Sequence, residues 1–219
     1  MSLEVKNLGL ENSIFNHYIA EIRDSLVQKD RMRFRTNLNR MGQILGYEIS
    51  KTLKYEEREV ITPLGQAFVP VLKDFPVLTT VLRAGLPLHD GLLQVFDRSD
   101  NGFISAYRMH HKDNEFEIKV EYASCPSLYE RTLILSDTML ATGNSMVLSF
   151  QTLIEEYGTP EHVHFVSVIG SSEGVEYLRK NVEIPATLWI GAIDEEMTAQ
   201  SYIVPGLGDA GDLAFGQKD

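Results

Sequence analysis

An aspartate followed by a run of small residues is the part of this sequence best suited to chemistry. Asp137 follows the mostly apolar run 132–136 and precedes Ala141-Thr142-Gly143-Asn144-Ser145. A small-residue loop between a strand and a helix leaves the first backbone N–H groups of that helix free to bind phosphate. A carboxylate beside a phosphate needs another partner, such as sugar hydroxyls or Mg²⁺. This order predicts a sugar-phosphate site, although a helix cap at Ser145 and a turn at Gly143 also explain the loop.

Three glycines near the C-terminus form a second unusual pattern. Gly206, Gly208 and Gly211 match G-x-G-x-x-G, but only eight residues follow Gly211. That is too few for the helix, second strand and acidic residue of a dinucleotide site. The glycines instead allow the backbone to approach a flat ligand closely, and a flexible tail is the alternative. The sequence has no G-x-x-x-x-G-K-[ST], which disfavours a P-loop ATPase.

Alternating strand and helix patterns surround the aspartate. Apolar runs predict strands at 77–82, 132–136, 163–169 and 186–190, and 3.6-residue periodicity predicts helices at 89–96, 146–157 and 173–180. Two β-like runs, 103–109 and 116–122, indicate a hairpin with a long loop. This alternation predicts a mostly parallel sheet, which binds ligands at the C-terminal ends of its strands.

The N-terminal region has a different pattern. Residues 12–54 look helical, with apolar positions falling on one face in each half, and residues 60–65 read as a short extended piece and a turn. Four arginines and a lysine lie between Lys29 and Arg40. We expect a solvated helix face there, with a subunit or effector contact as the alternative.

Composition restricts the class of protein. The 219 residues carry a net charge of −11, which disfavours binding to nucleic acid. No apolar run approaches the roughly 20 residues of a membrane-spanning helix, and the N-terminus lacks a signal-peptide pattern. Cys125 is the only cysteine, so no disulfide can form within the chain. We expect a cytoplasmic protein with a single domain over 1–219. Histidines at 110–111 and at 162 and 164 are expected to be structural rather than metal ligands.

Four segments together resemble one enzyme family. Residues 135–145, LSDTMLATGNS, resemble the phosphoribosyl-diphosphate (PRPP) motif of the uracil phosphoribosyltransferases. Residues 82–87, LRAGLP, resemble their pyrophosphate-side loop, and Tyr107-Arg108 matches a further position. Residues 202–212, YIVPGLGDAGD, followed by Phe215-Gly216, resemble their uracil-binding C-terminus, which is the most specific of these segments.

The resemblance implies a fold and a reaction. The fold would be a type I phosphoribosyltransferase-like parallel sheet flanked by helices, with a hood and a β-hairpin arm. The parts would be N-terminal helices at 12–54, a core at about 77–195 and a uracil-binding segment at 202–216. The reaction would transfer the phosphoribosyl group of PRPP to uracil, giving UMP and diphosphate. The catalytic residues would be Asp137, Asp209 and Arg83.

The resemblance also implies binding roles for individual residues. Asp137 would hold the ribose hydroxyls, residues 141–145 the 5′-phosphate, and Arg83 and Arg108 the diphosphate. The full PRPP set would be Arg83, Arg108, Asp137, Thr138, Met139, Leu140, Ala141, Thr142, Gly143, Asn144, Ser145 and Asp209. Ile203, Gly208, Asp209 and Ala210 would bind uracil.

Two positions depart from the family pattern. Thr138 stands where the family usually has Pro, and Asn144 stands where it usually has Gly. Asn tolerates positive φ better than other non-glycine residues, so we expect the loop to survive. Asp137 is a single acid where many type I enzymes have two, so Mg²⁺ is expected to arrive with PRPP. Activation by GTP and a homodimer or higher homo-oligomer, with the 103–122 hairpin as arm, are further expectations. The alternative is a pyrimidine-nucleotide-responsive RNA-binding regulator of the same fold.

Overall fold

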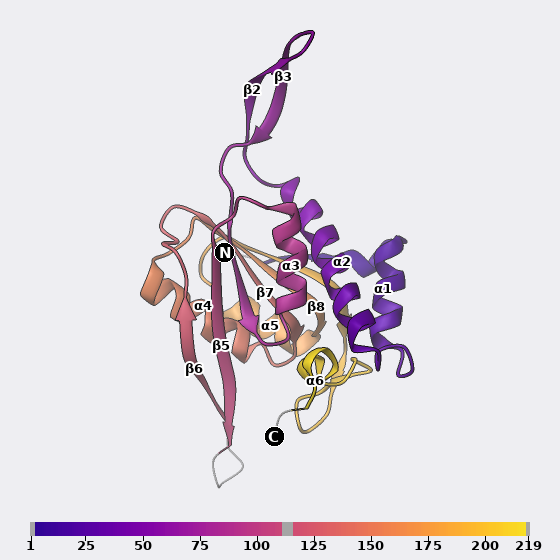
Figure 1. Ribbon diagram of the computed structural model, residues 1–219. Coiled ribbons are helices and arrows are strands. Elements are labelled where there is room, and N and C mark those ends of the chain that lie inside the picture. The colour runs from indigo at the N-terminus through magenta and orange to yellow at the C-terminus, as the bar shows by residue number, and fades with distance from the viewer. Residues whose placement is uncertain (1–2, 111–115, 218–219) are drawn as a thin grey trace.

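A seven-stranded sheet forms the centre of the molecule (Figure 1). The computed structural model describes residues 3–110 and 116–217. The strand order is β1-β9-β8-β7-β4-β5-β6, and every neighbouring pair is parallel except β5 with β6. The strands are β1 (Glu4–Asn7), β4 (Val77–Leu82), β5 (Asn101–His110), β6 (Phe116–Ser124), β7 (Thr132–Leu140), β8 (His162–Ser171) and β9 (Ala186–Asp194). The mostly parallel sheet predicted from the apolar runs is confirmed.

Helices cover both faces of this sheet (Figure 1). On one face, α4 (Asn144–Tyr157) and α5 (Ser172–Asn181) bury Phe150, Leu153 and Leu178 against the strands. On the other face, α1 (Ile14–Arg23), α2 (Arg31–Ser50) and α3 (Leu86–Val95) bury a second core that includes Phe34, Leu38 and Leu92. Strands buried on both sides explain why β7 and β8 read as nearly continuous apolar runs.

The order of the strands creates a topological switch point at the C-terminal ends of β4 and β7. From β4 the chain crosses through α3 to β5 on one side, whereas β7, β8 and β9 follow one another on the other side. The loops that leave β4 and β7 therefore diverge between two neighbouring strands. Such a switch point is where open parallel sheets bind ligands. The loops at residues 83–85 and 141–143 both begin there.

The predicted helical region at 12–54 contains two helices, α1 and α2, which agrees with the expected N-terminal helices. The Asp24 side chain accepts hydrogen bonds from the backbone N–H groups of Leu26 and Val27, which folds the chain into a turn after α1. Asp30 then caps α2 by accepting from the N–H of Arg33. Local side-chain bonds to the backbone therefore interrupt a pattern whose apolar periodicity alone appears continuous.

The structure contains two hairpins with different settings. The predicted hairpin at 103–122 forms as β5–β6, whose strands belong to the central sheet. A second hairpin, β2 (Tyr55–Thr62) with β3 (Gly65–Leu72), stands away from the body (Figure 1). The prediction of a short extended piece and a turn at 60–65 was therefore incomplete. No apolar core specifies this hairpin, because every β2 residue is exposed.

The C-terminal region consists of short elements. They are β10 (Glu196–Met197), β11 (Ile203–Val204) and α6 (Ala210–Phe215). Ile203, Leu207, Ala210 and Ala214 are buried in the core shared with α1, α2 and α3. Packing therefore holds this segment in place, and the alternative of a flexible glycine-rich tail is wrong. Among the described residues no helix is both long and apolar enough to cross a membrane.

Candidate active site

The loop after β7 ends in a helix start without a side-chain cap. Gly143 is the N-cap of α4, with φ of 81° and no capping hydrogen bond, and Ser145 lies inside the helix rather than at its cap. The Asn144 N–H lies 3.4 Å from the Thr142 hydroxyl. The reading of Ser145 as a helix cap is therefore wrong. An uncapped helix start presents N–H donors and a positive dipole end, which suits an anion.

A neighbouring loop supports the phosphate loop from behind. Ser171, the N-cap of α5, donates its hydroxyl to the Ala141 carbonyl oxygen at 2.6 Å and accepts from the Gly174 N–H at 2.9 Å. Sequence reasoning missed Ser171 and Gly174. Their only signal was the Ser-Ser-Glu-Gly run after a strand, which marks a helix start but does not identify the loop that it contacts.

Asp137 lies inside β7 rather than after it. The strand continues to Leu140, and Asp137 pairs with Ser167 of β8. The prediction that the strand ends at Ser136 was therefore too short. The side chain of Asp137 is half-buried. Burial raises the pKa of its carboxyl to about 7, against the lowering effect of hydrogen bonds with Thr138 and Met139. A carboxyl with this pKa is a frequent feature of functional sites.

The next three residues of the predicted PRPP set complete the strand. Thr138 and Leu140 are buried and Met139 is half-buried, because all three residues belong to the central strand β7. Ala141, Thr142 and Ser145 are half-buried, Gly143 is buried and Asn144 is exposed. Within residues 137–145, solvent therefore reaches Asp137, Met139 and the loop 141–145 apart from Gly143.

Arg83 links the loop after β4 to the C-terminal segment. The side chain is exposed, and its Nη2 donates to the Gly216 carbonyl oxygen at 3.3 Å. A residue predicted to bind PRPP therefore contacts the end of the predicted uracil-binding segment, although the two are more than a hundred positions apart in the chain. Arg108 lies in β5, and its side chain is outside what the structure describes.

The C-terminal segment presents backbone groups rather than side chains. Gly208 is exposed, has φ of 93°, and faces open space at the position a Cβ atom would take. Asp209 is exposed and caps α6 by accepting from the Asp212 N–H at 2.9 Å. Ile203 and Ala210 are buried, at 4% and 3% exposure, so only their backbone could meet a base.

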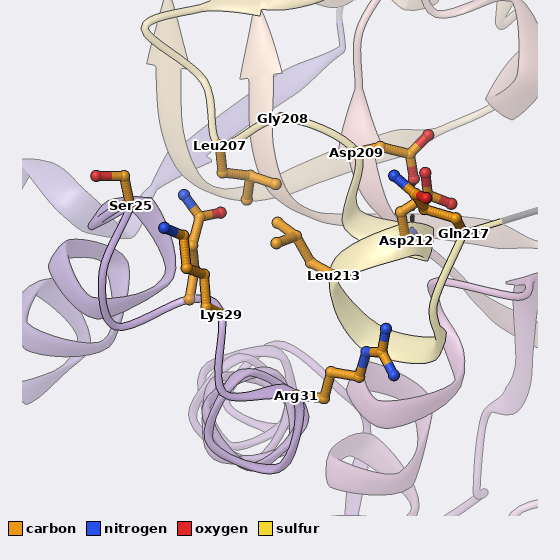
Figure 2. A pocket seen from close by; sticks show the side chains of 10 residues that line it. Ser25, Lys29, Arg31, Leu207, Gly208, Asp209, Asp212, Leu213 and Gln217 are labelled. Atoms are coloured by element: carbon orange, nitrogen blue, oxygen red, sulfur yellow. Dashed lines mark hydrogen bonds between the residues drawn. The ribbon is translucent and has the colours of Figure 1, made fainter.

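A cavity of about 520 Å³ lies beside this segment (Figure 2). Leu207, Gly208 and Asp209 line one side, and Ser25, Lys29 and Arg31 line the other. Its lining includes none of residues 137–145, so this cavity is separate from the loop that follows β7. The cavity is bordered by the predicted uracil-binding segment on one side and by the loop between α1 and α2 on the other.

Two arginines of α2 have specific partners, whereas Lys29 and Arg31 are exposed as expected of a solvated face. Arg33 binds both carboxylate oxygens of Glu21, at 2.7 and 2.6 Å. Arg35 donates to the Ala214 carbonyl oxygen at 2.6 Å, and its guanidinium lies 5.9 Å from the centre of the Phe215 ring. Arg35 therefore holds the C-terminal segment. The sequence pattern could not reveal this contact because it joins residues from opposite ends of the chain.

The histidines on β8 have structural contacts, as expected. His164 accepts from the Trp189 indole N–H at 3.1 Å, and burial lowers its pKa to about 3. His162 lies 3.1 Å from the Thr187 hydroxyl. Across the described parts of the chain, no three or more His, Cys, Asp or Glu side chains gather closely enough to hold a metal ion. His111 lies outside the described residues.

Solved structures define the class of this protein. The chain superposes on a protein from Aquifex aeolicus with a TM-score of 0.85, at 27% identity, covering 97% of this chain and 98% of that one. A hypoxanthine phosphoribosyltransferase from Staphylococcus aureus has the same fold, with a TM-score of 0.50 at 13% identity, over 85% and 83% of the two chains. The chain has the phosphoribosyltransferase fold.

Sequence comparison then defines the family. The family model of uracil phosphoribosyltransferase matches residues 10–217. A uracil phosphoribosyltransferase from Porphyromonas gingivalis is 48% identical over 216 residues, covering 99% of this chain and all of that one. One from Pyrococcus furiosus is 38% identical over 205 residues, covering 91% and 87%. The chain belongs to the uracil phosphoribosyltransferase family and is a pentosyltransferase.

Asn144→Gly is expected to leave activity within about twofold of wild type. The Asn144 side chain is exposed. The positive φ in this loop lies at Gly143, so Asn144 does not need to adopt it. Glycine in the first helical turn costs up to about 1 kcal/mol of stability. Steady-state kinetics with a thermal melt checks this result. A large loss of activity would show that the Asn144 side chain contacts a substrate.

Proposed function

We propose that three segments form the active site for transfer of the phosphoribosyl group from PRPP to uracil. They are the loop after β4 with Arg83, the end of β7 with residues 137–145, and the C-terminal segment 202–216. The observation that carries this proposal is the uncapped start of α4 after Gly143, at the switch point between β4 and β7. This helix start provides backbone N–H donors for one phosphate, and the carboxyl group of Asp137 lies a few residues earlier in the chain.

PRPP would lie along the end of β7. The loop 141–145 would bind the 5′-phosphate through backbone N–H groups and the hydroxyls of Thr142 and Ser145. Asp137 in its ionised form would accept hydrogen bonds from the ribose hydroxyls. Arg83 and Arg108 would bind the diphosphate. This order places carbon 1 of the ribose near the C-terminal segment, because Arg83 already contacts Gly216.

Uracil would be read by backbone groups of the C-terminal segment. It is small, flat and neutral, and its edge carries two carbonyls and two N–H groups. The open position at Gly208 leaves room for a ring at close range. Asp209 lies next to it and is exposed, which suits a role beside the reacting centre. A pocket that satisfies these polar edges would reject cytosine, since its own groups would be left unpaired.

The reaction needs positioning and charge stabilisation rather than a covalent intermediate. The bond from carbon 1 to diphosphate breaks and the diphosphate leaves with its electron pair. A uracil ring nitrogen bonds to carbon 1 and gives up its proton to the departing diphosphate or to water. Arg83 would offset the charge that develops on the leaving group. Mg²⁺ would enter bound to PRPP and add to that charge stabilisation. Asp137 is the single acid at this end of β7, which is in keeping with a metal held by substrate.

The direct test is conversion of labelled uracil to UMP by the purified chain with PRPP and magnesium. UMP formation that depends on both substrates is expected, with little turnover of cytosine. Absence of UMP, or equal use of cytosine, would contradict the proposed site. The alternative of an RNA-binding regulator predicts retention on heparin at low salt, which the net charge of −11 disfavours.

Arg83→Ala is expected to weaken PRPP binding about tenfold or more, because charge-assisted hydrogen bonds to the diphosphate are lost. Binding of ribose 5-phosphate, which lacks the diphosphate, should change much less. Calorimetric titration with each ligand measures both affinities. Equal weakening for the two ligands would show that Arg83 does not face the leaving group.

A homodimer or larger assembly is the proposed oligomeric state, with the β2–β3 hairpin as a contact. Ile61, Leu64 and Phe68 are exposed by 72%, 100% and 63%, and a two-stranded hairpin in water is marginal by itself. Replacing Ile61 and Phe68 by Ser should lower the mass found by light scattering. An unchanged mass would exclude these side chains from the interface.

Two further properties are proposed from family membership. The chain would work in the cytoplasm, and GTP would act as an activator. The GTP proposal predicts a higher rate at subsaturating PRPP when GTP is added, with ATP as the control nucleotide. Equal rates with and without GTP would contradict it.

A further inference from the structure

An ion pair lies at the base of the C-terminal segment, where the proposed chemistry does not use it. Arg23, the last residue of α1, binds both carboxylate oxygens of Asp194, the last residue of β9, at 2.8 and 2.9 Å. The side chains are 21% and 9% exposed, so water competes little for the contact. A paired, two-point contact of this kind has a defined geometry.

The same two side chains bind both polar backbone groups of one glycine. Arg23 Nη1 donates to the Gly206 carbonyl oxygen at 3.1 Å, and the Gly206 N–H donates to Asp194 Oδ2 at 3.0 Å. Gly206 has φ of 53°, and a Cβ atom there would lie 2.2 Å from the Ile203 carbonyl oxygen. The chain therefore turns sharply at Gly206, and the ion pair fixes the orientation of that turn.

Gly206 lies directly between the residues proposed to contact the base. Ile203 precedes it, and Gly208, Asp209 and Ala210 follow it. Arg35 and Arg83 hold the far end of the segment through the carbonyl oxygens of Ala214 and Gly216. Between Ile203 and α6, the Arg23–Asp194 pair supplies the side-chain hydrogen bonds to the backbone that connect the turn to the rest of the fold.

We propose that Arg23 and Asp194 are positioning residues that set the backbone donors and acceptors of residues 206–210 for uracil. The proposal rests on the assignment of this segment to the base. Backbone groups cannot be replaced by rotating a side chain, so recognition through them depends on the path of the chain. A small displacement of the turn weakens hydrogen bonds to uracil while leaving the phosphate loop after β7 unaffected.

The test uses Arg23→Lys and Asp194→Asn in the full-length enzyme. Lys keeps the positive charge but cannot bind both Asp194 oxygens and the Gly206 carbonyl together. Asn keeps the size of the side chain and removes the charge. The expected result for each is a KM for uracil raised about tenfold or more, with the KM for PRPP within about twofold of wild type. Thermal unfolding is recorded for each variant.

A control ion pair lies at the N-terminal ends of two strands of the sheet. Arg131 and Asp100 form a more exposed ion pair through one contact at 2.7 Å, just before β7 and β5. Arg131→Lys should change neither KM. A lower melting temperature in the Arg23 and Asp194 variants with both KM values unchanged would overturn the proposal, as would equal rises in both KM values. If one variant does not fold, the other decides.

One further variant separates this inference from the assignment beneath it. Gly208→Val fills the open position directly in front of the segment. If Gly208→Val raises the KM for uracil and Arg23→Lys does not, the positioning role is wrong and the uracil site stands. If Gly208→Val leaves the KM for uracil unchanged, the segment does not read the base, and both proposals fail.

Discussion

Asp137→Asn is expected to lower turnover about a hundredfold or more while the fold is kept. An ionised carboxylate can accept hydrogen bonds from both ribose hydroxyls, and charged acceptors bind more strongly than a neutral amide. Asp137 is half-buried at the end of the site, with its pKa raised to about 7 by burial. Steady-state kinetics and PRPP titration measure the loss. Unchanged turnover and PRPP affinity would remove Asp137 from the site.

The raised pKa of Asp137 also predicts a pH dependence with a definite sign. Below about pH 7 the carboxyl takes up a proton and loses its charge, so PRPP affinity should fall as pH decreases through 7. PRPP has phosphate groups that titrate in the same range, so the informative quantity is the difference between wild type and Asp137→Asn. The variant should lack the part of the pH dependence that belongs to the carboxyl.

Stability should change in the opposite direction to activity. The Asp137 pKa in the unfolded chain is about 4, so between about pH 4 and pH 7 the folded state binds more protons than the unfolded state. Its contribution to stability is therefore greatest at low pH and is lost as pH rises through 7. At pH 8, Asp137→Asn should melt at the same temperature as wild type or higher. A clear decrease would indicate that the carboxylate stabilises the fold.

Gly143→Val is expected to weaken PRPP binding more than tenfold and to lower the melting temperature. Gly143 has φ of 81°, and a Cβ atom there would lie 2.9 Å from the Gly174 carbonyl oxygen and 3.2 Å from Tyr177 Cβ. A β-branched residue in this conformation costs about 1–3 kcal/mol. The loop would move to relieve the contact, and its N–H groups would no longer converge on the 5′-phosphate.

Gly158→Val is the matched control for this loss. Gly158 lies at the other end of α4 with φ of 93°, so valine there carries the same kind of backbone strain away from the loop. It should lower the melting temperature and leave PRPP affinity close to wild type. If both glycine variants weaken PRPP equally, the effect of Gly143→Val reflects general destabilisation, and the loop is not the phosphate site.

Local patterns in the sequence determined the elements of the central sheet. Strand β4 was predicted at its observed bounds, and β7, β8 and β9 were predicted with ends one to four residues short. Strands buried on both faces need continuous apolar runs, so their positions can be predicted from the sequence. The strand ends were short because polar residues such as Asp137 continue the ladder with β8 beyond the apolar run.

The β2–β3 hairpin shows where such patterns stop being informative. Strand β2 has no buried face, so neither alternation nor an apolar run marks it. The apolar run at 67–72 in β3, which Pro70 interrupts, was not interpreted as a strand. The position of the break between the two N-terminal helices was not predicted, since it depends on side-chain bonds from Asp24 and Asp30. These features follow from specific hydrogen bonds and cross-strand pairing, which hydrophobic periodicity does not report.

The sequence alone was enough to predict the segments suited to the chemistry and the family that combines them. These segments are an acid, a small-residue loop predicted to bind phosphate, and a glycine-rich segment. Only the tertiary structure decided how they meet. The strand order places the loops after β4 and β7 at one switch point, and contacts from Arg23, Arg35 and Arg83 hold the C-terminal segment beside them. Those arginines bind carbonyl oxygens, which every residue carries, so no side-chain pattern in the sequence can identify their partners.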